Sequence, residues 1–199
     1  FQIKKLKQIK ESIQSFNKRR KFSNDPNYEK KEKDKELKKY APIYPKDLND
    51  SKVLITGSTG MIGGAITDLC IASEKITSII SLTRRGSERN SEKLTELFMG
   101  SKWDYKEVEE YLSDIDIVYY CLGVYTGSVN EEMFIKLTLD FPLELAEVLI
   151  SKSPNCRFCL LSGQGADRTE ESQVLFAKYK GMIENKISAL GFKSFHSFR

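Results

Sequence analysis

The sequence predicts a doubly wound, parallel α/β domain that follows a basic, largely irregular or helical N-terminal extension. Short β-branched, apolar runs alternate with segments of helical periodicity, and strands that alternate with helices form a parallel sheet covered on both faces. A glycine-rich turn joins the first apolar run to the first helical segment. No apolar run reaches the ~18–20 residues that a membrane-spanning helix needs, so we expect no integral membrane protein.

Positive charge is concentrated at the start of the chain. Residues 1–50 contain 15 Lys and Arg against 8 Asp and Glu, out of 32 and 28 in all 199 residues. Residues 51–199 therefore contain 17 basic and 20 acidic side chains. We predict a basic extension over 1–50 and a nucleotide-binding domain over 51–199, whose mildly acidic balance argues against a nucleic-acid partner.

The extension begins with an amphipathic pattern. Its apolar side chains recur at intervals of three and four residues, at Ile3, Leu6, Ile9, Ile13 and Phe16. Such a helix can dock on another protein subunit or lie on an anionic membrane surface, and a solvated or self-packed extension is the alternative to both. A basic, amphipathic start favours a mitochondrial location, with the cytoplasm as the alternative.

The glycine-rich turn is the candidate for cofactor binding. It follows the strand predicted over 53–56 and opens a helix, which is the arrangement that binds the diphosphate of a dinucleotide. Gly57 permits the tight turn, Gly60 lets backbone N–H groups approach the diphosphate, and Gly63 lets the helix lie close to the strand. The predicted binding residues of this turn are Gly57, Ser58, Thr59, Gly60, Met61, Ile62 and Gly63.

A pair of arginines follows the second predicted strand, 77–83. A dinucleotide fold that prefers NAD places an acid here to bind the ribose 2′-hydroxyl, whereas arginine suits the 2′-phosphate of NADP. This sequence has Arg84 and Arg85 and no acid. The pair therefore predicts NADP(H) as the cofactor.

The rest of the chain continues the alternation of predicted strands and helices. We predict helices over 90–98, 106–112, 134–148 and 172–190, and strands over 116–123, 157–162 and 192–198. Pro142 should bend the third of these helices. The strand over 116–123 ends in Cys121, Leu122 and Gly123, which we expect beside the nicotinamide side of the cofactor. No histidine and cysteine cluster has the spacing of a metal site, so no metal is predicted.

Together these motifs resemble the short-chain dehydrogenase/reductase superfamily, in its atypical, NAD(P)-binding, epimerase-like branch with a Rossmann-like fold. The resemblance covers about 52–199. It rests on the glycine turn, on Cys121-Leu-Gly123, on the segment 160–167 and on the segment 176–181. Members normally continue after the sixth strand into a substrate-binding lobe, and the sequence given stops at Arg199, so the resemblance leads us to expect that this lobe is absent.

The resemblance also implies catalytic positions. Active members place a serine on the fifth strand and a tyrosine four residues before a lysine, which lowers the tyrosine pKa and holds the cofactor ribose. Ser162 and Lys180 match the serine and the lysine, as catalytic and as cofactor-binding residues, but Phe176 stands at the tyrosine position. Tyr179 is turned about a hundred degrees from Lys180 on a helix and is no simple replacement.

Two functions from different classes follow from this pattern. The first is a non-catalytic accessory subunit that binds NADP(H) and joins a larger, mitochondrial assembly through its basic extension. The second is an NADP-dependent oxidoreductase or epimerase-like enzyme in which another group replaces the tyrosine. A third interpretation is a regulatory protein that senses the NADPH/NADP ratio through the same nucleotide-binding site.

Overall fold

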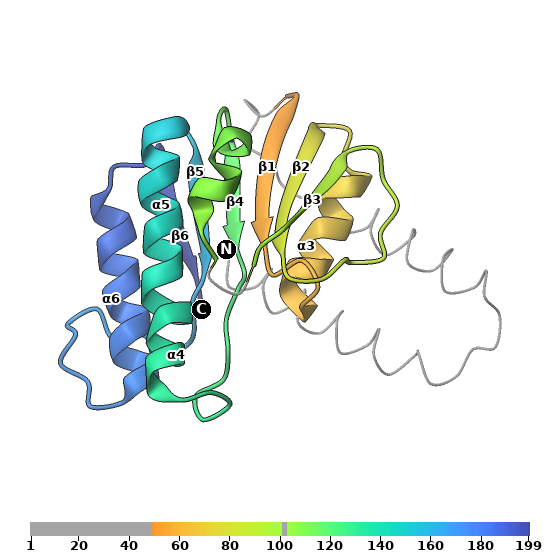
Figure 1. Cartoon of the computed structure of the whole chain (residues 1–199). Coiled ribbons are helices and arrows are strands. Elements are labelled where there is room, and N and C mark those ends of the chain that lie inside the picture. Colours follow the sequence, from red (N-terminus) through yellow and green to blue (C-terminus); the bar gives the residue numbers. More distant parts are fainter. Residues whose placement is uncertain (1–48, 101–102) are drawn as a thin grey trace. The chain divides into compact units, whose positions relative to one another are not determined.

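The computed structural model describes residues 49–100 and 103–199, so the predictions for residues 1–48 lie outside the described part of the chain. That part contains a six-stranded parallel sheet in the order β3-β2-β1-β4-β5-β6 (Figure 1). The strands are β1 (Ser51–Thr56), β2 (Ile76–Thr83), β3 (Leu94–Phe98), β4 (Ile117–Tyr120), β5 (Arg157–Leu161) and β6 (Ser194–Phe198). The order reverses between β1 and β4, which confirms the predicted doubly wound fold.

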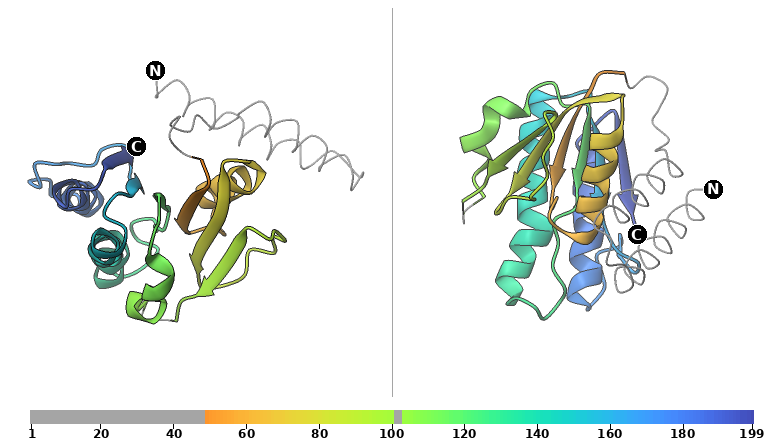
Figure 2. Two further views of the ribbon diagram at one scale, coloured as in Figure 1. Left: turned by 90° about the horizontal axis from the view of Figure 1, so that it is seen from above. Right: turned by 90° about the vertical axis from the view of Figure 1, so that its right-hand side faces the viewer.

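Helices cover both faces of this sheet (Figures 1 and 2). They are α3 (Met61–Ala72), η1 (Tyr105–Leu112, a 3-10 helix), α4 (Glu131–Ile135), η2 (Lys136–Asp140, a π-helix), α5 (Phe141–Lys152) and α6 (Leu175–Ala189). None of the helices within the described ranges is long and apolar enough to cross a bilayer.

The central strand, β1, contributes side chains to the core on both faces of the sheet. Val53 and Ile55 of β1 pack in one core cluster with Cys70 of α3, whereas Leu54 packs in a larger cluster formed with η1, α5 and α6. All three β1 side chains are fully buried. A strand that is buried on both faces has to be apolar at every position, as parallel strands usually are.

The prediction of a helix over 90–98 was wrong. Residues 94–98 form β3, an edge strand that pairs with β2 from Ile79↔Leu94 to Thr83↔Phe98. The apolar residues Leu94, Leu97 and Phe98 have the spacing of a helix face, and this spacing misled the interpretation. The open edge of β2 offers backbone hydrogen bonds along its whole length, and tertiary pairing outweighs a local pattern of this kind.

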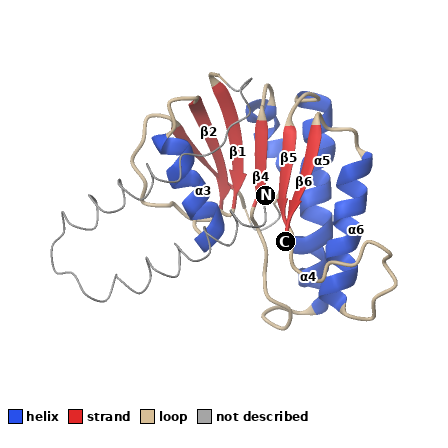
Figure 3. Cartoon of the chain, turned by 180° about the vertical axis from the view of Figure 1, so that it is seen from behind, coloured by secondary structure: helices blue, strands red, loops and turns tan. Residues whose placement is uncertain are grey.

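Two predicted helices differ from their expected form (Figure 3). The helix predicted over 134–148 is interrupted by the π-helix η2, immediately before Pro142 in the first turn of α5. Proline cannot donate a backbone hydrogen bond, so the change of helical pattern falls where the predicted bend was expected. The last helix begins at Leu175 rather than at 172, because the Asp167 carboxylate accepts hydrogen bonds from the backbone N–H groups of Thr169 and Ser172 and holds that segment as a loop.

Candidate functional site

The carboxyl ends of three neighbouring strands bring the predicted site residues to one edge of the sheet. Thr56 of β1 pairs with Tyr120 of β4, and Tyr120 pairs with Leu160 of β5. The glycine turn, the segment from Cys121 and the segment from Ser162 therefore leave the sheet side by side. In open α/β sheets this edge, at the point where the strand order reverses, is where ligands bind.

The glycine turn lies directly against the segment that follows β4. Gly57 has a φ of +75°, and a Cβ there would lie 2.8 Å from the carbonyl oxygen of Cys121. A Cβ on Gly63 would lie 2.2 Å from the carbonyl oxygen of Gly57. Neither position can carry a side chain, so the turn has the close backbone approach that the sequence predicted.

The first turn of α3 is open to an anion. Gly60 is its N-cap residue, no side chain caps the helix, and no acidic residue lies in the first turn. Helix N-termini present backbone N–H groups without intrahelical partners and carry partial positive charge. Gly60 is exposed, and Met61 is 63% exposed. These features fit a diphosphate at this helix end.

The side chain of Ser58 points into the protein rather than toward a ligand. Ser58 is fully buried, and its hydroxyl accepts a 2.7 Å hydrogen bond from Ser81 of β2. Thr59 and Ile62 are half-buried at the turn. Ser58 can therefore contribute to anion binding through its backbone and fixes the turn to the neighbouring strand with its side chain.

Arg84 and Arg85 are exposed at the carboxyl end of β2, beside the glycine turn of β1. The Thr83 hydroxyl donates a 2.7 Å hydrogen bond to the carbonyl oxygen of Arg85 and accepts one from its N–H. The backbone there is thus fixed while both guanidinium groups face solvent. This placement suits the recognition of a 2′-phosphate.

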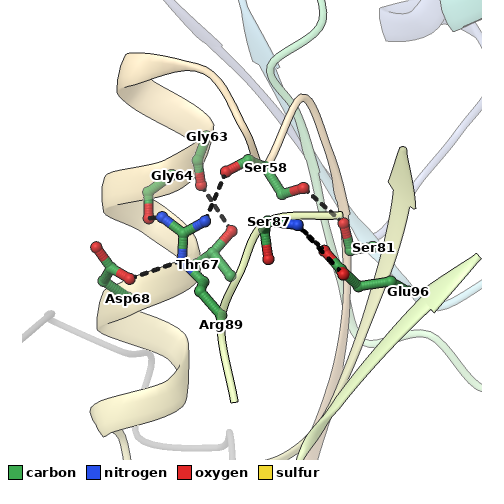
Figure 4. A network of polar contacts seen from close by, with 9 residues as sticks. All are labelled: Ser58, Gly63, Gly64, Thr67, Asp68, Ser81, Ser87, Arg89 and Glu96. Carbon is green, nitrogen blue, oxygen red and sulfur yellow. Dashed lines mark hydrogen bonds and ion pairs between the residues drawn. The ribbon is translucent and has the colours of Figure 1, made fainter. Parts of the chain in front are cut away.

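A third arginine, absent from the sequence predictions, lies closer to the glycine turn. Arg89 forms an ion pair with Asp68 of α3, and its guanidinium also donates to the carbonyl oxygens of Ser58 and Gly64 (Figure 4). No motif marks Arg89, because the loop after β2 has no fixed length, and only the fold brings it to α3.

The segment after β4 lines the other side of the turn. Cys121 donates its backbone N–H to Thr56, and burial raises the pKa of its thiol to about 12, so it is a neutral packing group near pH 7. Leu122 packs against the larger core cluster. A Cβ on Gly123 would meet no heavy atom within 4 Å, so this residue borders open space.

Ser162 and Lys180 both lie at the carboxyl edge, but they face different partners. Lys180 is buried and donates a 3.1 Å hydrogen bond to the Leu161 carbonyl oxygen. Ser162 donates a 2.6 Å hydrogen bond to Glu184, whose carboxylate is also bound by Arg199. The serine hydroxyl is therefore committed to a buried carboxylate that the sequence predictions missed. Its position four residues after Lys180, on the same helix face, was a signal that could have identified it.

Phe176 fills the space beside Ser162. A Cβ on Gly163 would lie 2.2 Å from Cζ of the Phe176 ring and 3.1–3.2 Å from its two Cε atoms, so the tip of the ring points end-on at the glycine backbone. The phenylalanine provides no hydroxyl group there. The proton-transfer tyrosine of the resemblance is thus replaced by an apolar ring, in contact with the segment that carries the serine.

The environment of Lys180 favours its neutral form. Burial lowers its pKa from the ordinary 10.5 to about 8, although Glu184 and Cys121 act in the opposite direction. A partly neutral lysine at pH 7–8 still donates hydrogen bonds, and a cofactor ribose needs only a donor. The residue can therefore hold a ribose in either protonation state.

Comparison with known proteins agrees with this geometry. Residues 53–174 match the family described as NAD dependent epimerase/dehydratase. The chain is 25% identical over 156 residues to Protein HTATIP2 of Rattus norvegicus, covering 76% of this chain and 62% of that protein. It is 30% identical over 150 residues to Protein fmp52, mitochondrial, of Emericella nidulans, covering 72% and 63%. The chain thus spans less than two thirds of the length of these relatives.

Solved structures show the same fold at lower identity. The Bordetella bronchiseptica enzyme WbmH in complex with NAD+ aligns with a TM-score of 0.60 and 18% identity, over 75% of this chain and 55% of that one. MoeE5 in complex with UDP-glucose and NAD aligns with a TM-score of 0.58 and 15% identity, over 75% and 54%. These likenesses establish the fold of the described domain.

Proposed function

Because the chain belongs to the NAD-dependent epimerase/dehydratase family, we propose that it binds NADP(H) at the turn between β1 and α3 and acts as a non-catalytic accessory subunit of a larger assembly. The observation that carries the binding proposal is the contact of Gly57 and Gly63 with surrounding backbone, next to an uncapped helix end. That close packing admits no side chain at either glycine, and the uncapped helix end beside it fits a diphosphate.

The preference for NADP(H) rests on charge at the end of β2. Arg84 and Arg85 are exposed there, and the next acidic residue, Glu88, lies beyond the glycine at 86. Two guanidinium groups suit a 2′-phosphate, and the position lacks the acid that would bind a free 2′-hydroxyl.

The non-catalytic role rests on Phe176 and Glu184. An apolar ring replaces the proton donor, and the Ser162 hydroxyl is bound to a buried carboxylate. The first feature removes the tyrosine, and the second occupies the serine, of the arrangement by which active members would transfer a proton to a substrate. A bound cofactor of this kind stabilises the subunit that holds it.

The most direct test is to identify the nucleotide that the purified chain carries. The protein is denatured, and the released ligand is identified by mass spectrometry. We expect NADP+ or NADPH in near-stoichiometric amount. NAD alone would contradict the arginine argument, and a protein that neither carries nor binds either nucleotide would contradict cofactor binding itself.

The assembly is proposed to form through residues 1–22, in a mitochondrial location. The support is the basic, amphipathic sequence and the relative named mitochondrial. Native electrophoresis of a tagged chain would show a large complex that is lost on deleting 1–22. A variant with serine at Ile3, Leu6, Ile9, Ile13 and Phe16 keeps the charge. Loss of the complex in that variant indicates docking by the apolar stripe, and a chain that migrates alone before any deletion contradicts the accessory role.

The second candidate is an NADP-dependent oxidoreductase or epimerase-like enzyme. Lys180 and Ser162 favour it, because both lie at the edge where the cofactor would bind. Oxidation of NADPH across a panel of small carbonyl compounds distinguishes it from the accessory subunit, for which we expect no turnover above the buffer rate.

A further inference from the structure

Arg89 connects two segments that are separate in the sequence. Its Nε donates a 2.8 Å hydrogen bond to Asp68 Oδ1, and its two terminal nitrogens donate to the Ser58 carbonyl oxygen at 3.2 Å and the Gly64 carbonyl oxygen at 3.1 Å (Figure 4). Arg89 belongs to the loop between β2 and β3, and its three acceptors belong to the glycine turn and α3. Three of the five N–H donors of one planar group thus bind one small region.

The chain leaves space for this guanidinium. A Cβ on Gly64 would lie 2.9 Å from a terminal nitrogen of Arg89 and 3.1 Å from the Ser58 carbonyl oxygen. Gly64 is not one of the three glycines that the dinucleotide turn requires. Its lack of a side chain is explained by the arginine that packs over it.

The loop between β2 and β3 also contains Arg84 and Arg85, the proposed 2′-phosphate-binding pair. Hydrogen bonds hold this loop on both sides of Ser87. The Thr83 hydroxyl binds the backbone of Arg85, and the Ser87 N–H donates to the Glu96 carboxylate at 3.0 Å. Arg89 supplies the anchor that ties the loop to the glycine turn itself. Without Arg89, the other anchors of residues 84–88 join the loop to β2 and β3, and Lys93 joins its last residues to the far end of α3, away from the glycine turn.

Charge argues for a positioning role rather than direct binding. The Arg89 side chain is 21% exposed and is paired with Asp68, whereas Arg84 and Arg85 are exposed at the cofactor edge. An arginine that is largely buried, whose charge is paired with a carboxylate and three of whose five N–H donors are bound, is less available to a phosphate than the two exposed arginines. Arg89 therefore affects ligand binding by fixing the position of the loop between β2 and β3.

We infer that Arg89 is a specificity-determining positioning residue, which fixes Arg84 and Arg85 relative to the glycine turn and so sets the preference for NADP(H) over NAD(H). This inference rests on the proposed cofactor binding. NADPH bridges both regions, because its diphosphate lies at the turn and its 2′-phosphate at the arginine pair. NADH places a neutral 2′-hydroxyl where NADPH places its 2′-phosphate, and this hydroxyl forms no ion pair with the arginines, so NADH binding depends much less on the position of the loop.

The experiment compares R89Q with K93Q in the full chain. Lys93 is a matched control, because it lies in the same loop and its ammonium group donates to the carbonyl oxygens of Ser73 and Ile71 at the opposite end of α3. Affinities for NADPH and NADH are measured by titration calorimetry. Hydrogen–deuterium exchange of residues 84–90 is measured without nucleotide, as a readout that needs no ligand.

We expect R89Q to weaken NADPH about tenfold and NADH about twofold or less, with faster exchange over 84–90, and K93Q to change neither. R89K keeps the charge but loses the planar fork, so it should behave as R89Q does. An unchanged NADPH-to-NADH ratio in R89Q, an equal loss in K93Q, or full recovery in R89K would each overturn the inference. Wild-type protein that binds neither nucleotide would overturn the proposed function itself, whereas wild-type discrimination that R89Q leaves intact would overturn only the role of Arg89.

Discussion

The hydroxyl of Ser162 donates a 2.6 Å hydrogen bond to Glu184, which lies one helical turn beyond Lys180 on α6. The Glu184 side chain is 1% exposed, and Arg199 binds both of its oxygens. A buried carboxylate with charge-assisted partners on two sides is held in one position. The serine at the end of β5 is thereby joined to α6 and to the end of β6.

We predict that Glu184→Gln destabilises the domain by about 1–3 kcal/mol, because it removes the buried charge and sets an NH2 group, which cannot accept a hydrogen bond, against Arg199 or Ser162. Urea unfolding measures the loss. Ser162→Ala should cost less, and the double variant should lose less than the two single losses combined. Strictly additive losses would show that the serine and the glutamate do not stabilise each other.

A pH dependence follows from Lys180. Its pKa is about 8 in the folded protein and 10.5 when unperturbed, so between these values the unfolded chain binds more protons than the native one. The free energy of unfolding therefore rises with pH in this window. We expect Lys180→Met to remove a rise of roughly 1–2 kcal/mol between pH 7 and about pH 9.5.

The comparison of wild type with Lys180→Met also controls for other buried groups that titrate in this pH range. Cys70, Cys121, Cys156 and Cys159 have pKa values raised by burial to about 12, and they lower stability as pH rises above their ordinary 9.0. Wild type and Lys180→Met both contain these cysteines, so the difference between them reports the lysine together with its influence on the neighbouring Cys121. A difference that is constant from pH 7 to about 9.5 would contradict the low lysine pKa.

Replacing Arg84 and Arg85 together by alanine should weaken NADPH by about a factor of ten or more and leave NADH nearly unchanged. The reason is that, in the proposed binding mode, the pair would contact the 2′-phosphate, which only NADPH has, whereas both cofactors would share the diphosphate contacts. Fluorescence titration of both nucleotides measures the ratio. An equal loss for NADPH and NADH would mean that these arginines do not contact the phosphate.

The doubly wound parallel fold and the glycine turn were predictable because local sequence patterns indicate both. Gly57, Gly60 and Gly63 have a spacing that only a tight strand-to-helix turn requires, and the buried strands are apolar at nearly every position. Arg89 and the edge strand β3 were not predictable in the same way. Each depends on a partner far away in the sequence, and a loop of free length gives no spacing by which to find it.

Phe176→Tyr tests whether the missing hydroxyl is what prevents turnover. Cζ of the ring points end-on at Gly163, next to Ser162, so a tyrosine hydroxyl added at that atom would meet the Gly163 backbone, and the ring or that segment has to shift to admit it. The melting temperature of the variant is therefore measured first, to show that it folds. We expect any basal NADPH oxidation to rise by about two orders of magnitude, which is typical of a positioned general acid. Tyr179→Phe is the matched control and should change nothing. A rate that stays at the basal level in Phe176→Tyr would indicate that a substrate pocket, rather than a proton donor, is lacking.

Alanine substitutions at two glycines of the turn between β1 and α3 should affect folding and nucleotide binding separately. A Cβ on Gly63 would lie 2.2 Å from the Gly57 carbonyl oxygen, whereas a Cβ on Gly60 would meet only that oxygen, at 3.2 Å, and otherwise point to solvent. Gly63→Ala should therefore lower the melting temperature by several degrees, because backbone must move to admit the methyl group. Gly60→Ala should melt within about two degrees of wild type and still weaken NADPH and NADH alike, because its methyl group occupies the path of the diphosphate. Calorimetric melting measures the stability of the two variants, and nucleotide titration measures their affinities for NADPH and NADH. Full nucleotide affinity in a folded Gly60→Ala would place the diphosphate elsewhere.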